Sequence, residues 1–315
     1  MTHVVHTVLG DIDPADLGRT NGHEHLFQVS PLLPGDELDD EEASREEARL
    51  LRASGFDAMV DATPIGLGRR PARVAAMSAA TGLSVVASTG IHREAHYPDG
   101  HPLRALDADE RARRFVRDLV DGMPEHDGTD APARHDGGPV RAGLIKTGIG
   151  YWSISAFERA TLEGAAAAHA ETGAAIMVHL EHGTAGHEVL DLLASLGVVA
   201  ERVLLAHADR LIDPGHHAEL LARGCALGYD GVARWRDGSD HELLELTAAV
   251  VERGHDRIVL GGDVARASRY VAYGGMPGLA YLGERYLPRL RERIGAEAVE
   301  RMLVAHPAGL LALPA

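Results

Sequence analysis

Short apolar runs that end in a glycine or a polar residue alternate along the chain with longer amphipathic segments. Eight such runs predict β-strands, over residues 19–26, 57–64, 83–90, 142–149, 174–181, 202–209, 224–231 and 257–264. The segments between them are rich in Ala, Leu, Glu and Arg and predict helices over residues 41–54, 70–82, 107–120, 155–173, 183–197, 214–224, 240–254 and 281–304. Several of these segments open on Ser, Asp or Pro and close on Gly, as capped helices do.

Nearly continuous apolar strands that alternate with helices indicate a parallel sheet in an α/β fold. Eight strand–helix units in 315 residues predict a single (β/α)8 barrel, with residues 1–315 as one domain. A doubly wound open sheet is the competing architecture. Residues 121–140 are rich in Gly, Pro, Asp and His and lack apolar periodicity. They predict a mobile surface insertion between the third helix and the fourth strand, not a domain boundary.

The composition narrows the classes of partner. The formal net charge is −16, from 31 basic and 47 acidic residues, so nucleic acid and anionic membrane surfaces are poor partners. The single cysteine, Cys225, excludes an internal disulfide and a Cys-based zinc site. No apolar run approaches the roughly 18–20 residues that span a bilayer, and the first residues lack the pattern of a secretory signal. We therefore expect a cytoplasmic protein that acts on a small molecule.

Six polar residues interrupt or end the predicted strands. They are His23 and His25 in the first strand, Lys146 in the fourth, His179 in the fifth, His207 in the sixth and Asp263 in the eighth. Residues two apart on a strand share a face, so both imidazoles of the first strand point the same way, opposite to Glu24. Because reactive groups of such barrels gather at the carboxyl ends of the strands, we expect all six at one mouth. Four imidazoles and one carboxylate suit a divalent transition metal such as Zn²⁺.

Lys146 is the unusual member of this set. Its protonated ammonium has no lone pair and would repel a cation. A neutral amine, which burial favours, can react with carbon dioxide to give a carbamate (N6-carboxylysine) whose two oxygens can each hold one metal. Taken alone, Lys146 fits half of a buried ion pair, Asp263 fits a helix cap, and each histidine fits a hydrogen-bonded core residue. The coincidence of all six favours a metal site.

Several motifs together resemble the phosphotriesterase-related family of the amidohydrolase superfamily. The opening VHTVLGDIDPADLGRTNGHEHLF resembles the amino-terminal signature of that family, and LIKTG resembles the strand of its bridging lysine. MVHLEHG and LLAHAD resemble its two later histidine strands, GGDVAR the strand of its last aspartate, and LVAHPAGLLAL its C-terminal segment. These matches run in the same order over nearly the whole chain. The HxH pair alone would be weak support.

The resemblance implies a binuclear site. His23, His25 and Asp263 would hold the more buried ion, and His179 and His207 the outer one. Carbamylated Lys146 and a hydroxide would bridge the two ions, which are expected to be Zn²⁺, with Mn²⁺, Co²⁺ or Fe²⁺ as alternatives. In this scheme the hydroxide attacks the substrate, Asp263 accepts the attacking proton, and Asp263 and Lys146 are catalytic. The resemblance also implies a homodimer.

The substrate class follows less directly. Gly231 comes after Asp230 where the better-known lactonases and phosphotriesterases of the family have an Arg. The segment DVARASRYVAYGG resembles the branch called phosphotriesterase homology proteins, some of which resemble lactonases of phosphorylated sugars. We therefore expect a lactonase. A phosphotriesterase or carboxylesterase, an N-acyl amide hydrolase, and a metal-containing binding protein without turnover are the alternatives.

Substrate contacts are expected on the loops around the mouth. Tyr151 and Trp152 follow the fourth predicted strand, Trp235 follows the seventh, and Arg266 and Arg269 follow the eighth. With Arg234 and Arg236, these arginines would form a positive patch suited to an anionic tail. The alternatives are that the aromatic side chains only pack the loops, and that the arginines pair with Asp230, Asp237 and Asp240. His92, His96, Tyr97 and His101, on the third loop, are expected to be structural or solvated.

Overall fold

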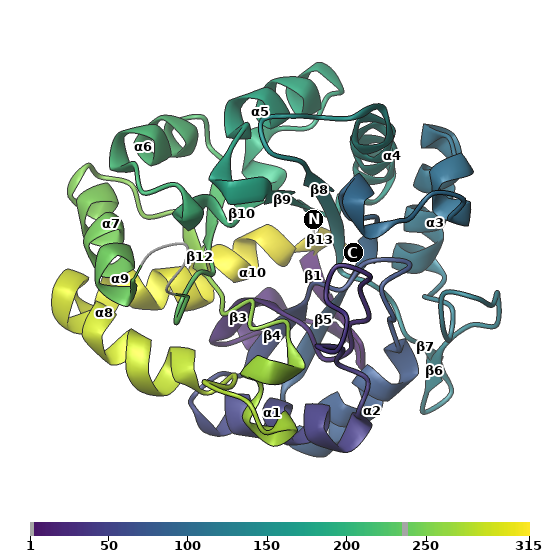
Figure 1. Ribbon diagram of the computed structural model, residues 1–315, viewed down its shortest axis with the longest axis horizontal. Coiled ribbons are helices and arrows are strands. Elements are labelled where there is room, and N and C mark those ends of the chain that lie inside the picture. Colours follow the sequence, from purple (N-terminus) through teal and green to yellow (C-terminus); the bar gives the residue numbers. More distant parts are fainter. Residues whose placement is uncertain (1–2, 235–238) are drawn as a thin grey trace.

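The computed structural model of the protein describes residues 3–234 and 239–315. Eight parallel strands follow one another in a single sheet, and helices surround it (Figure 1). The strands are β3 (Thr20–Glu24), β4 (Ala58–Asp61), β5 (Ser84–Gly90), β8 (Leu144–Ile149), β9 (Ile176–Leu180), β10 (Val203–Ala206), β11 (Ala226–Tyr229) and β12 (Ile258–Leu260). After β12, the amides of Gly262 and Asp263 donate to the carbonyl oxygen of His23 at 3.3 and 2.9 Å. These bonds join the two ends of the sheet into a nearly closed barrel, so the predicted (β/α)8 architecture is confirmed.

The helices up to residue 254 fall where the amphipathic segments predict them, but the segment predicted as one helix over residues 281–304 is broken at Gly295, and a further helix follows it. Their bounds are α1 (Glu41–Ala53), α2 (Pro71–Thr81), α3 (Ala108–Val120), α4 (Ala156–Thr172), α5 (Gly186–Ser195), α6 (Pro214–Ala222), α7 (Asp240–Glu252), α8 (Leu287–Ile294), α9 (Ala296–Glu300) and α10 (His306–Leu311). Local chemistry sets their ends. Asp107, Ser155 and Ser239 each form a capping box with a glutamate three residues on. Gly173 ends α4 with φ 74°, a conformation that favours glycine.

The strands alternate between two apolar layers. In β8, Ile145 and Ile149 pack outward against the helices, whereas Leu144 packs into the barrel interior. Lys146 lies two residues after Leu144 and therefore faces inward as well. The same alternation places His179 inward, two residues after Met177 of β9. Inward-facing positions near the carboxyl ends of the strands thus carry polar side chains, and those near the amino ends carry apolar ones.

The two termini of the chain close the amino end of the barrel. Strand β1 (His3–Thr7) pairs antiparallel with β2 (Gly10–Ile12) and with β13 (Leu313–Pro314), and β1 and β13 lie near the centre of the helical ring (Figure 1). Val5 of β1 and Leu310 and Leu311 of α10 pack on the apolar residues at the starts of the strands. This plug leaves the carboxyl end as the open mouth.

The segment 121–140, which the sequence predicts as an insertion, contains a short hairpin of β6 (Arg134–His135) and β7 (Gly138–Pro139). Its Asp127 accepts hydrogen bonds from the Gly66 amide at 2.8 Å and from Arg69 Nε at 3.0 Å. The segment is therefore tied to the loop that follows β4. Among the described residues, none of the helices has the length and apolar character that crossing a membrane requires.

Candidate metal centre

A cavity of about 590 Å³ opens at the carboxyl end of the barrel. Seven histidines line it: His23, His25, His92, His96, His179, His182 and His207. Asp263, Glu181 and the arginines Arg93, Arg210, Arg234, Arg266 and Arg269 line it too. Lys146 lies beneath the cavity with its amine close to His23. The structure thus brings the six side chains predicted at the mouth into one region.

One possible ion position lies between β3 and the residue that follows β12. The Nε2 atoms of His23 and His25 lie 3.7 and 3.5 Å from Asp263 Oδ1, and the two imidazole rings are 5.5 Å apart. One ligand atom from each of these three residues falls within 4.8 Å of the others. A histidine–histidine–carboxylate set at this spacing can hold one divalent ion.

The second pair of imidazoles lies beside the first. The rings of His179 and His207 have centroids 4.4 Å apart, and His207 lies 5.0 Å from His23. Gly148 makes room for this packing, because a Cβ there would come within 3.0 Å of His92 Nδ1 and 3.1 Å of His179 Cβ. A side chain at position 148 would therefore displace the rings. Glycine at the end of β8 is part of how the site is built.

Carboxylates and a hydroxyl hold the far nitrogens of these rings. Asp230 accepts hydrogen bonds from His23 Nδ1 at 2.8 Å and from His207 Nδ1 at 2.6 Å. His179 donates from Nε2 to Glu181 Oε2 at 2.8 Å, and His25 Nδ1 lies 2.7 Å from Thr63 Oγ1. Each imidazole therefore has one nitrogen anchored and the other left for a ligand. Histidines that bind metals are oriented in this way.

The electrostatics of the buried groups agree with a metal site. Burial lowers the pKa of His23 to about 4 and that of His207 to about 3, so both rings are neutral at pH 7 and keep a free lone pair. Burial disfavours the charge of Asp230, but the adjacent imidazoles of His207 and His23 outweigh it, and its pKa lies well below the usual range. Asp230 is therefore an anion that stabilises both rings.

Lys146 is fully buried and lacks an anionic partner. Its Nζ lies 3.2 Å from Met177 Sδ and 3.4 Å from His23 Nε2. Within residues 3–234 and 239–315 it forms no ion pair within 4.0 Å. Burial lowers its pKa to about 8, although Asp263 and Asp230 act in the opposite direction. The neutral amine needed for a carbamate is thus accessible near physiological pH.

Two arginines at the mouth contact Asp263, whereas Asp237, one of the partners that the sequence offers, lies outside the described residues. Arg234 Nη2 lies 2.6 Å from Asp263 Oδ2, and Arg210 Nη2 lies 3.2 Å from the same oxygen. Asp230 instead holds the two histidines, and Asp240 accepts from the Ala233 amide. Burial opposes the ionisation of Asp263, but Arg234 and the nearby imidazoles keep its pKa well below its usual range.

The predicted substrate contacts lie in different places. Arg266 and Arg269 line the cavity, and Arg269 donates to the carbonyl oxygens of Asp263 and Val264 at 3.4 Å. Tyr151 and Trp152 are 62% and 56% exposed and do not line it, although Tyr151 contacts the ring of His182 edge-on at 5.9 Å. Trp235 and Arg236 lie outside the described residues.

Sequence reasoning missed the anchoring groups. Asp230 is the last residue but one of the seventh predicted strand, where a buried carboxylate could have indicated a functional role. Glu181 follows His179 by two residues, which places it on the same side of the chain. Arg210 follows the LLAHAD motif directly. His92 and His96, predicted to be structural or solvated, are both buried, which agrees with the structural alternative, and both line the cavity wall.

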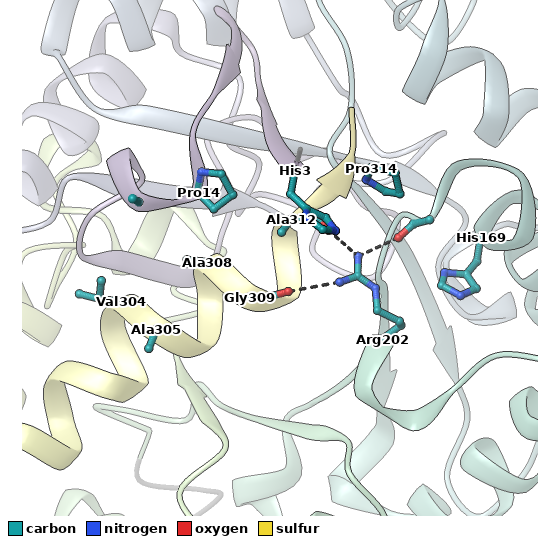
Figure 2. A pocket seen from close by; sticks show the side chains of 12 residues that line it. His3, Pro14, His169, Arg202, Val304, Ala305, Ala308, Gly309, Ala312 and Pro314 are labelled. Carbon is teal, nitrogen blue, oxygen red and sulfur yellow. Dashed lines mark hydrogen bonds between the residues drawn. The ribbon is translucent and has the colours of Figure 1, made fainter. Parts of the chain in front are cut away.

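A larger hollow, of about 750 Å³, lies at the opposite end of the barrel (Figure 2). Small and apolar residues make most of its wall, including Pro14, Ala305, Ala308 and Pro314. Its one arginine, Arg202, donates from Nη1 to the carbonyl oxygen of Gly309 at 3.2 Å. From Nη2 it donates to Gly173 at 2.7 Å and to Ala312 at 2.9 Å. The guanidinium group of Arg202 therefore binds backbone carbonyl oxygens of the chain segments around this hollow.

Fold and site together define a (β/α)8 barrel with a candidate histidine–carboxylate metal site at the carboxyl ends of its strands. Residues 3–311 match the phosphotriesterase family, to which the chain belongs. A phosphotriesterase homology protein of Mycobacterium tuberculosis is 32% identical, covering 96% of each chain. A phospho-furanose lactonase of Mycoplasmopsis synoviae is 29% identical, covering 97% of this chain and 91% of the relative. The crystal structure of a lactonase from Listeria monocytogenes superposes with a TM-score of 0.89 at 28% identity, covering 98% of both chains.

Proposed function

We propose that this protein is a binuclear metal-dependent lactonase that prefers lactones with an anionic or strongly polar tail. The observation that carries the proposal is the donor set of one cavity: four imidazoles, each anchored through its other nitrogen, with Asp263 and the buried Lys146. The similarity to proteins named as lactonases supports the choice of ester substrate. A binding protein without turnover has no need for the lysine.

The residues present fit two divalent ions. His23, His25 and Asp263 would hold one ion, and His179 through Nδ1 and His207 through Nε2 would hold the other. Lys146, as N6-carboxylysine, would contribute an oxygen to each. Zn²⁺ suits these ligands best, with Mn²⁺, Co²⁺ and Fe²⁺ as alternatives. When bound, such a pair supplies an activated hydroxide near neutral pH and polarises the substrate carbonyl.

Asp263 would handle the proton of the attacking water. Its Oδ2 already faces Arg210 and Arg234, and although burial opposes ionisation, Arg234 and the nearby imidazoles keep the pKa of the carboxyl low. A carboxyl of low pKa releases a proton readily, so Asp263 would pass it to the ring oxygen as the lactone C–O bond breaks. The product is the open-chain hydroxy acid.

Arg266 would recognise the tail of the substrate. It lines the cavity and, among the described residues, forms no ion pair within 4.0 Å. Arg269 lines the same wall but donates to backbone carbonyls, so its role would be to hold the loop. Tyr151 and Trp152 would contact substrate only at the rim. The proposal extends to a cytoplasmic homodimer with a small-molecule substrate.

The experiment measures kcat/KM of metal-loaded protein for one lactone with and without an anionic tail, next to a phosphotriester and an N-acyl amide. We expect the anionic lactone to be the best substrate. In Arg266→Ala, kcat/KM for the anionic lactone should fall on the order of 10- to 150-fold, with the neutral lactone unchanged. Arg269→Ala should lower both equally. A preference for the phosphotriester or the amide over every lactone contradicts the proposal.

A further inference from the structure

A separate cavity of about 540 Å³ shares no lining residue with the metal cavity. It lies between the loop after β4, the 3₁₀ helix Pro102–Ala105, helix α3 and the insertion around Asp127. The residues that matter for its charge are Arg69, Arg70, His101, Arg114, His126 and Asp127. In a chain of net charge −16, this cavity gathers three arginines and two histidines around one acidic residue.

The acidic residue of the wall is already neutralised. Asp127 accepts from Arg69 Nε at 3.0 Å through one oxygen and from the Gly66 amide at 2.8 Å through the other. Arg69 is 5% exposed and also donates to the buried Asp118 at 2.9 Å. Asp127 and Arg69 therefore form an ion pair that is held in place on one wall of the cavity. They leave no free carboxylate oxygen to compete for the other cations of the cavity.

Arg70 and Arg114 line the same cavity as Asp127 and Arg69, but their side chains have no hydrogen-bond or ion-pair partner among the described residues. Within residues 3–234 and 239–315, neither guanidinium group forms a hydrogen bond or an ion pair. Each guanidinium therefore keeps all five of its donors available. Helix α3 presents Arg114 from one side, and the residue before α2 presents Arg70 from the other.

Two imidazoles add donors to the same wall. His101 Nδ1 accepts from the Leu103 amide at 3.2 Å, and His126 Nδ1 accepts from the Gly128 amide at 3.2 Å. A neutral imidazole that accepts at Nδ1 carries its proton at Nε2. Both rings are thus set as Nε2 donors, so they add hydrogen-bond donors to the cavity wall.

We propose that this cavity binds a small molecule through its phosphate group. A phosphate dianion offers acceptor oxygens that match two planar guanidinium groups, which bind such groups in a bidentate manner. The cavity volume leaves room for a small organic body next to the phosphate. The site is distinct from the metal centre and does not depend on the reaction catalysed there.

The test is calorimetric titration of inorganic phosphate into metal-loaded protein, with Arg70→Ala/Arg114→Ala as the diagnostic variant. Arg113→Ala removes one positive charge from an exposed position of the same helix and serves as the matched control. Arg266→Ala controls for phosphate bound in the metal cavity. We expect the double variant to lose at least about 10-fold in affinity at one site, and both controls to keep that site.

Arg70→Lys/Arg114→Lys retains the charge and should recover only part of the affinity, because an ammonium lacks the planar pair of donors. Melting temperatures within a few degrees of wild type would show that the variants fold. Equal phosphate binding by wild type and Arg70→Ala/Arg114→Ala would overturn the proposal. It would also be overturned if acetate bound as tightly as phosphate, since simple charge attraction would then suffice.

Discussion

The two ends of the barrel use the same residue types for different purposes. At the amino end, Arg202 donates to three backbone carbonyls and His169 Nδ1 contacts the carbonyl oxygen of Ala174. At the carboxyl end, Arg210 contacts the Asp263 carboxylate and His23 contacts Asp230. Partners that are backbone carbonyls indicate a structural role, whereas charged partners around a cavity indicate chemistry. This contrast, not the size of the hollow, locates the functional end.

The largest expected effect comes from removing a ligand at the carboxyl end. His23→Ala and Asp263→Ala should each lower metal content from two ions per chain and reduce turnover to background, because three ligands hold that position. Elemental analysis and activity measure both quantities. His169→Ala, at the amino end, is the matched control and should retain two ions and full activity. Two ions in His23→Ala would contradict the ligand assignment.

Lys146→Ala should lose one or both ions and most activity, since the carbamate proposed to bridge the two positions can no longer form. A short-chain carboxylate in the buffer should restore part of the activity by replacing the carbamate. Lys146→Arg should not be rescued, because a guanidinium stays cationic and forms no carbamate. Mass spectrometry of intact metal-loaded protein should show the added carbon dioxide. Full activity in Lys146→Ala would assign the lysine a structural role.

A smaller effect should follow from neutralising the anion that orients two histidines. Asp230→Asn should weaken metal binding about 10- to 100-fold, since outer groups of this kind have effects of that size. Asp209→Asn is the control. Burial raises the pKa of Asp209 to about 8, so its carboxyl is largely neutral at pH 7 and an amide has the same charge. Chelator competition measures both affinities. If Asp230→Asn and Asp209→Asn weakened metal binding equally, Asp230 would have no specific role in orienting the two histidines.

The sequence predicted those features of the fold and site that depend on local hydrophobic periodicity and on the order of the strands. All eight barrel strands follow from their apolar runs, and the positions of His23, His25, Lys146, His179 and Asp263 at one mouth follow from the parallel arrangement. The contact of Asp230 with His23 joins residues 207 positions apart, so no local pattern reveals it. The pairing of β1 with β13 joins residues still further apart in the sequence, such as His3 and Pro314.

The arginines illustrate the same limit. The sequence shows how many arginines lie near the mouth. Which carboxylate each arginine contacts depends on how the loops after β11 and β12 pack against each other. Arg234 meets Asp263 and not Asp230 or Asp240, because Asp230 is turned inward to the histidines. The charge of Asp263 is therefore set by loop contacts that composition alone does not specify.

The smallest expected effect on catalysis, and a clear effect on stability, concerns Arg202. Arg202→Ala leaves the carbonyl oxygens of Gly173, Gly309 and Ala312 without their donor. Because these groups are partly exposed and regain water, the cost in free energy of unfolding should be about 1–2 kcal/mol, the low end for lost charged hydrogen bonds. The melting temperature should fall by a few degrees, while metal content and kcat/KM of the folded protein stay within about two-fold of wild type. Arg202→Lys should recover part of the loss, since one ammonium can reach fewer carbonyls than the guanidinium fork. A selective loss of activity at unchanged melting temperature would instead place function at the amino end and reverse the contrast between the two ends of the barrel.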